Sequence, residues 1–308
     1  MSADYAVALL ASTAGAATPL ALASLGELVA ERSGVLNLGV EGMMLVGAIA
    51  GFAAGVHSGN LAVAFAAAML AGILMSLLFG VLALTLQTNQ VATGLALTLF
   101  GIGLSAFAGR AYAGLPIPGL KGVSIPGVSD LPIVGPLLFR FDPIVYASLA
   151  LFAVLQWFLY RSRGGLLLRA VGESPEVAHS LGYPVVLVRY LAVMFGGAMA
   201  GLAGAYLSCV LTPMWSEGLT SGRGWIALAL VVFATWKPWR ALLGAYLFGG
   251  VTILQLHAQG SGFAVPSEFM SMLPYAATIV VLVLICRDPR TILLNQPGSL
   301  GRAFHADT

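Results

Sequence analysis

The sequence predicts an all-α, polytopic transmembrane helix bundle with about nine membrane helices, or eight to ten. Of its 308 residues, 59% are hydrophobic and only 8% are charged, and the mean hydropathy is +0.95. A soluble domain has about 25% charged residues, so this composition excludes a soluble fold. Apolar runs recur from one end of the chain to the other, which predicts a single transmembrane domain over 1–308.

The expected helices follow these apolar runs in order. They lie near 5–30, 35–56, 61–84, 90–111, 143–160, 186–212, 225–236, 241–257 and 270–286. The run at 225–236 is too short to cross a bilayer alone, because a span needs about 17 to 20 residues. It therefore starts earlier or forms half of a broken helix.

Basic residues predict the orientation. If the chain starts outside, ten Lys and Arg fall on the cytoplasmic side and four on the external side. The cytoplasmic set is Arg32, Arg161, Arg163, Arg169, Arg189, Lys237, Arg240, Arg287, Arg290 and Arg302, and the external set is Arg110, Lys121, Arg140 and Arg223. This positive-inside bias places 161–185 and the tail 287–308 in the cytoplasm.

Prolines and glycines predict an irregular external loop at 112–142. This loop is either a cover for the bundle or a docking surface for an extracytoplasmic partner. Gly47, Gly51 and Gly55 lie four residues apart, a spacing that lets membrane helices pack closely.

Two Ser-Gly pairs give a weak indication of an internal sequence repeat. One opens the apolar run at Ser33–Gly34 and another at Ser221–Gly222, on opposite sides of the predicted topology. An inverted internal repeat, as found in transporters, produces such a pattern.

The segment 31–47, ERSGVLNLGVEGMMLVG, carries the first polar groups inside an apolar run. Asn37 and Glu41 lie four residues apart, so in a helix they share one face. In a bilayer such groups must face protein or water. They either line a polar path or bond to neighbouring helices, and for Glu41 a structural pairing or cap is the favoured interpretation.

Further polar residues extend the candidate path: Asn89, Gln90 and Thr93. Amide and hydroxyl groups suit a hydroxylated solute. The alternative is again that they bond to neighbouring helices. Trp225 is either a further candidate for the path or an anchor at the external membrane interface, and the anchor is the favoured interpretation.

The second informative segment is 164–184, GGLLLRAVGESPEVAHSLGYP, which is polar enough to lie outside the bilayer. Ser174 can N-cap a short helix, Pro175 fits its first position, and Glu176 supports its first turn. Gly182 ends it. We expect a helix of about two turns parallel to the membrane, which is stable only if a partner protein packs on it.

Three stretches resemble one superfamily. Glu176-Val177-Ala178 followed by Gly182 is similar to the EAA loop of ABC importer permeases, with Val177 where a second small residue is usual. LRAVGESPEVA resembles the version in permeases for simple sugars, nucleosides and branched-chain amino acids. ERSGVLNLGVEGMMLVGA and SGRGWIALALVVFATWKP, the latter followed by LPYAATIVVLVL, look most like the nucleoside and simple-sugar subgroup.

The resemblance implies the permease subunit of an ATP-driven importer, multi-pass in a bacterial inner (plasma) membrane. Such a subunit forms half of the translocation path for a nucleoside or simple sugar. In that family the loop is a coupling helix that docks on the ATPase. Carried onto this chain, the coupling residues are Glu173, Ser174, Pro175, Glu176, Ala178 and Gly182.

The resemblance also implies partners: ABC ATPase subunits, a second and paralogous permease, and an extracytoplasmic substrate-binding protein. The sequence has no G-x-x-x-x-G-K-[ST] phosphate loop, so ATP and Mg²⁺ are expected on the ATPase, and this chain is expected to be no enzyme and to hold no cofactor. It shows no basic nucleic-acid patch, and its surroundings are the lipid bilayer.

One alternative stays open, a proton- or sodium-coupled secondary transporter in which Glu41 is the coupling carboxylate. Such a transporter has no need of a helix at 173–183. The four histidines show no metal-ligand spacing, and Cys209 and Cys286 are interpreted as packing residues, so no metal site is expected.

Overall fold

The computed structural model describes residues 3–120, 122, 123, 135, 139–260 and 295–305, together with 269, 272, 273, 276, 277, 279, 280 and 283. Within these residues every regular element is a helix, and the extended contacts are two isolated β-bridges. Seven of the helices are long and apolar enough to cross a membrane. The predicted polytopic helix bundle is therefore confirmed.

The helices follow the apolar runs closely. Their bounds are α1 Ala3–Arg32, α2 Val40–Ser58, α3 Leu61–Gly80, α4 Gln90–Gly109, α6 Pro143–Arg161, α7 Arg163–Glu173, α8 Pro175–Ser180, α9 Val185–Tyr206, α10 Arg223–Phe233 and α11 Pro238–Gly260. Short π-helical turns, Val81–Thr85 and Leu207–Leu211, extend α3 and α9, and a 3₁₀ turn, Arg110–Tyr112, follows α4.

The predicted broken crossing is confirmed at α10. This helix has 11 residues, about half of what a span needs, and an irregular segment, 212–222, leads into it. Together they make one discontinuous crossing beside the seven continuous ones. Only part of the predicted helix at 270–286 is described, and much of the predicted loop at 112–142 lies outside the described residues.

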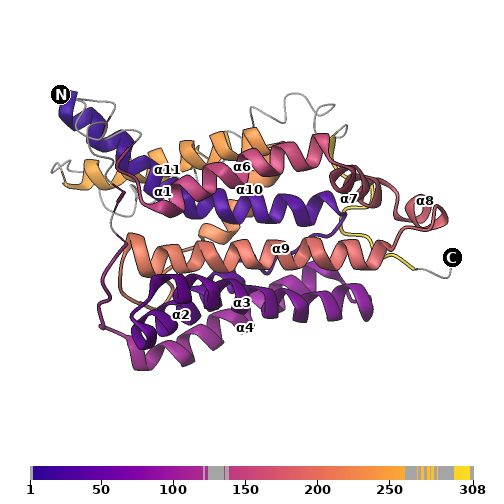
Figure 1. Ribbon diagram of the computed structural model, residues 1–308, viewed down its shortest axis with the longest axis horizontal. Coiled ribbons are helices and arrows are strands. Elements are labelled where there is room, and N and C mark those ends of the chain that lie inside the picture. Colours follow the sequence, from indigo (N-terminus) through magenta and orange to yellow (C-terminus); the bar gives the residue numbers. More distant parts are fainter. Residues whose placement is uncertain are drawn as a thin grey trace.

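Helix α9 runs through the middle of the bundle and packs on α1, α2 and α3 (Figure 1). Glycines make this close packing possible, as the spacing predicted. A Cβ atom on Gly47 of α2 would lie 2.6 Å from the carbonyl oxygen of Gly201 in α9. The two backbones therefore touch without intervening side chains.

The two ends of the bundle differ. Figure 1 shows α7, α8 and the C-terminus together at one end, and the N-terminus at the other. We call the first the tail end, because residues 295–305 pack there. It carries Arg32, Arg169, Arg189 and Arg302, the basic residues that predict a cytoplasmic face.

Candidate functional site

Helix α8 is the short helix expected in the coupling segment, and it projects from the tail end (Figure 1). Pro175 occupies its first position, as predicted. Ser174 makes no bond to the backbone amides, and its Oγ lies 3.4 Å from a carboxylate oxygen of Glu176. Gly182, at φ +85°, ends the segment, because this conformation suits glycine alone. The helix is confirmed, and the Ser174 side-chain cap is wrong.

An apolar surface faces outward from α8 and the turn that follows it. Val177, Leu181 and Tyr183 expose 58%, 70% and 46% of their area, and we call these three residues the coupling surface. Their neighbours Glu173 and Glu176 are also exposed. An exposed apolar patch with a charged rim is typical of a surface that binds another protein.

The six residues predicted to couple divide into two groups. Glu173, Glu176 and Gly182 are exposed and Ser174 is half-buried, so these four can reach a partner. Pro175 and Ala178 are buried and hold α8 against the rest of the chain. Leu181 and Tyr183 were not among the predicted coupling residues, although two large apolar residues in a polar loop are a signal visible in the sequence.

The C-terminal tail holds α8 in place. Phe304 packs with Val171, Ala178 and Val185, and its ring stands edge-on to His179 at 5.6 Å between centroids. The sequence predicted only that 287–308 is a cytoplasmic tail. In the structure residues 295–305 of this tail form the underside of the coupling segment.

The same tail is bonded to the helix bundle through Ser299 and Arg189. The Ser299 N–H and Oγ both donate to the Gly172 carbonyl, at 3.0 and 2.7 Å. The buried guanidinium of Arg189 donates to Ser299 Oγ at 3.0 Å, to the Ser33 carbonyl at 3.2 Å and to the Arg302 carbonyl at 3.3 Å. One cation thus links α9, the tail and the residues that follow α1.

Asn37 is not on a helix, which corrects the prediction that it shares a helical face with Glu41. α2 begins at Val40, and residues 33–39 form an irregular link. Gly34 starts it at φ +88°, and Asn37 Oδ1 accepts from the Gly39 N–H at 2.9 Å, a local turn that competes with helix. The Asn37 N–H donates to the buried carboxylate of Glu27 at 3.2 Å.

Glu41 is buried and serves as the cap of α10. One carboxylate oxygen accepts from Thr220 Oγ at 2.6 Å and from the Gly222 N–H at 2.9 Å, and the other accepts from the Gly224 N–H at 2.6 Å. A carboxylate at a helix N-terminus satisfies free amides and complements the helix dipole. The favoured interpretation, a structural cap, is the one this geometry supports.

The other predicted path residues lie at the tail end. Asn89 is exposed and N-caps α4 through a 3.0 Å bond from the Ala92 N–H. Gln90 and Thr93 are buried: Gln90 Oε1 accepts from the Leu36 N–H at 2.9 Å, and Thr93 Oγ donates to the Asn89 carbonyl at 2.8 Å. Of the five predicted path residues, only Asn89 reaches the surface of this chain.

The position of Glu41 between the two ends of the bundle follows from its neighbours on α4. Gln90 starts α4 beside the tail, and Gly109 ends it at the opposite end of the bundle. Gly42 packs against the backbone of Thr98. At 1.5 Å per residue, Thr98 lies about 12 Å from the start of α4 and about 16 Å from its end. Glu41 and the start of α10 therefore lie near mid-depth.

The position of Trp225 corrects another expectation. It follows Gly224, whose Cα is so close to Glu41 that a Cβ there would lie 2.6 Å from the Glu41 Cα. Trp225 is thus at mid-depth, not at the external interface. It is exposed on the surface of this chain, as are Ser216, Glu217 and Ser221 on the segment leading to it.

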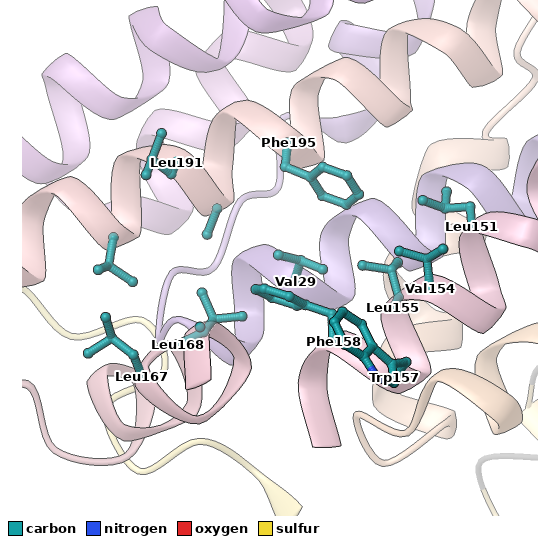
Figure 2. Close-up of a pocket in the computed structure, with 13 residues that line it drawn as sticks. Val29, Leu151, Val154, Leu155, Trp157, Phe158, Leu167, Leu168, Leu191 and Phe195 are labelled. Atoms are coloured by element: carbon teal, nitrogen blue, oxygen red, sulfur yellow. The ribbon is translucent and has the colours of Figure 1, made fainter. Parts of the chain in front are cut away.

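A well-formed pocket of about 450 Å³ lies elsewhere, between α1, α6, α7 and α9 (Figure 2). Its lining is aliphatic and aromatic, with Val29, Phe158, Leu168 and Phe195 among the side chains. Of its lining side chains only that of Trp157 carries a polar atom, the indole N–H, so the pocket is poorly matched to a solute with several hydroxyl groups. Among the described residues, no three His, Cys, Asp or Glu side chains come together as metal ligands.

Comparison with known proteins now identifies the family. The family model described as "Branched-chain amino acid transport system / permease component" matches residues 9–282. TsgC13 of Haloferax volcanii, a permease named for glucose ABC transport, is 42% identical over 99% of each chain.

Two further relatives are named for nucleosides. The guanosine ABC transporter permease protein NupQ of Bacillus subtilis is 34% identical over 86% of this chain and 88% of its own. The nucleoside ABC transporter permease protein NupC of Lactococcus lactis is 32% identical over 87% and 88%. A multi-pass bundle with these relatives is a protein of the inner (plasma) membrane. The chain belongs to the permease components of the branched-chain amino acid transport family and is the transmembrane permease subunit of an ABC importer.

Proposed function

We propose that this subunit forms half of the translocation path for a simple sugar or a nucleoside, and that the coupling surface on α8 binds a separate ATPase. The relatives named for glucose and guanosine support this range of substrates. A second, paralogous permease supplies the other half of the path. An extracytoplasmic binding protein delivers the solute.

The coupling role is supported by two features of α8: apolar side chains are exposed on its outer side, and buried residues hold it from beneath. Val177 on α8 and Leu181 and Tyr183 in the turn after it face outward, and α8 is too short to be stable alone. Phe304 and Ala178 fix it from beneath. A rigid helix with an exposed apolar face transmits the movement of a partner to the bundle.

ATP and Mg²⁺ belong to the ATPase in this proposal, and this chain supplies no catalytic residue. The sequence offers no phosphate loop that could hold them. Closure of the ATPase pair would move α7 and α8, and through the tail and Arg189 would move the residues after α1.

The test is copurification with the ATPase, using Leu181→Asp. Burial of a new charge at the interface should lower the recovered ATPase by about tenfold or more, while the permease still inserts. Leu166→Asp is the matched control, because Leu166 is an exposed leucine at the same end, on α7 and outside the coupling surface. Normal recovery with Leu181→Asp would refute the docking role.

Reconstituted uptake tests the substrate range. Vesicles that hold the complete complex should accumulate glucose or guanosine only with ATP and the binding protein present. Uptake that follows a proton or sodium gradient without ATP would refute the proposal and restore Glu41 as a coupling carboxylate.

A further inference from the structure

The irregular segment 212–222 descends into the bundle with four of its five polar side chains exposed, Thr220 being buried against Glu41. It starts beside Ala113 and Pro116, after α4 has ended, and reaches Glu41 at mid-depth. Trp215 packs on Gly109, and the start of α10 lies level with Gly101, eight residues lower on α4. The descent is therefore about 12 Å.

This backbone cannot face lipid. Irregular chain within the hydrocarbon region is tolerated only where protein buries it or where it lines water, because unsatisfied peptide groups in lipid are very unfavourable. Ser216, Glu217, Gly218 and Ser221 are exposed on this chain, so burial within the chain does not explain the segment.

A charged side chain also lies at this depth. Arg223 is half-buried, and its Nη1 donates to the Leu219 and Thr220 carbonyls, both at 3.2 Å. Charged side chains in membrane proteins face a water-filled cavity or a partner group. Arg223 stands directly between the two amides that Glu41 caps.

The backbone here is also held in an unusual conformation. Ser221 has φ +49°, a left-handed conformation that L-residues seldom adopt, between Gly218 at +68° and Gly222 at +80°. Glu41 fixes this turn from behind through Thr220 and Gly222. Backbone strain of this kind concentrates at functional sites.

We infer that Ser216, Glu217, Ser221, Arg223 and Trp225 form a solute-contact site of the translocation path, which takes a neutral solute bearing several hydroxyl groups. The inference rests on the proposed function and deepens it. Carboxylate, guanidinium and hydroxyl groups bond to solute hydroxyls, and the Trp225 indole offers a flat face to a sugar ring or a base. Glu217 and Arg223 have opposite charges, which favours a neutral solute.

The first experiment measures whether Ser221 faces water and solute. Ser221→Cys is made in a chain whose two native cysteines are replaced by alanine, and the assembled importer is treated with a water-soluble thiol reagent. Leu99→Cys is the matched control, because Leu99 is 70% exposed at the same depth on the apolar face of α4. The reagent attacks only a hydrated thiolate, so Ser221→Cys should react about tenfold faster or more.

Transported solute should then slow this reaction. Glucose or guanosine, supplied with the binding protein and ATP, should reduce labelling of Ser221→Cys about threefold, and the solute that protects separates a sugar from a ribosyl group. Equal reaction at Ser221→Cys and Leu99→Cys would overturn the inference, as would fast labelling that neither solute slows.

The second experiment tests Trp225. Trp225→Ala should raise KM for uptake about threefold to tenfold, whereas Trp225→Phe should restore it, because aromatic packing contributes about 0.5–1.5 kcal/mol. Trp157→Ala, at an exposed Trp of α6, should leave KM unchanged. An unchanged KM in Trp225→Ala would refute the contact between Trp225 and the solute but not the proposed function. Absence of ATP-driven uptake in the wild-type complex would refute the proposed function itself.

Discussion

The irregular segments 33–39 and 212–222 both enter the bundle, and they differ in how far their residues are buried. The segment 33–39 follows α1 and leads into α2, and five of its seven residues are buried. The segment 212–222 leads into α10, and most of its residues are exposed. We call 33–39 the sealed segment, because its residues are mostly buried within this chain, and 212–222 the open segment, because its residues are mostly exposed on the surface of the chain. A polar residue within an apolar run can therefore mark either a structural joint or a path.

The two segments also differ in how many of their backbone amides donate hydrogen bonds. Six of the seven amides in 33–39 donate a bond, and the acceptors include the side chains of Gln90, Glu27 and Asn37. In the second segment, the amides of residues 216–220 donate to no other described group. The segment 33–39 is held in place because all but one of its amide donors are bonded, whereas 212–222 depends on the Glu41 cap.

Removing that cap should produce the largest effect. Glu41→Leu leaves Thr220 Oγ and the amides of Gly222 and Gly224 without an acceptor at mid-depth. We expect a loss of about 3 kcal/mol or more in unfolding free energy, together with failure to assemble. Thermal unfolding in detergent and the yield of complex measure both.

Glu41→Gln separates the cap from a proton-carrying role. Its amide keeps one acceptor oxygen, so it should retain assembly and most uptake, with no change in the pH dependence of uptake. A fully assembled Glu41→Gln complex without uptake would mean that the carboxylate does more than cap α10.

Loss of the Arg189 bonds that join the segment 33–39 to the tail should lower stability by an intermediate amount. Arg189→Leu removes the donors to Ser33, Ser299 and Arg302, and we expect a loss of about 2 kcal/mol. The tail should become sensitive to protease, and less ATPase should copurify. Arg189→Lys, which keeps the charge but not the planar fork, should fall between the two. A tail that stays protected in Arg189→Leu would contradict this link.

The smallest effect is expected at Asn37. Asn37→Ala removes two side-chain bonds, the one that Oδ1 accepts from the Gly39 N–H and the weak one that Nδ2 donates to Met43 Sδ, and should lower stability by about 1 kcal/mol. Because Asn37 is buried behind α2, KM for uptake should not change. A raised KM at normal stability would place Asn37 on the path after all.

Much of this architecture could be predicted from the sequence, since apolar runs locate membrane helices directly. The position of α8 was readable from Pro175 and Gly182, and the short run at 225–236 signalled a broken crossing. The partners of Glu41 could not be predicted, because they lie about 180 residues away and no local pattern links them. The non-helical state of Asn37 had a signal in Gly34 and Gly39, which the four-residue spacing of Asn37 and Glu41 outweighed.

The inverted repeat stays a prediction. Ser33–Gly34 follows the end of α1, whereas Ser221–Gly222 directly precedes α10. The two pairs therefore occupy different local positions, and hydropathy alone cannot decide whether the helices around them are related by symmetry.

Hydrogen–deuterium exchange on the assembled wild-type importer tests the contrast between the two segments most directly. Peptides that cover 33–39 should stay protected for hours, because their amides are bonded and buried. Peptides that cover 216–220 should exchange within about a minute, at least a hundredfold faster, because their amides face water. Equal protection of the two segments would contradict the account, since it would mean that the second segment is sealed as well.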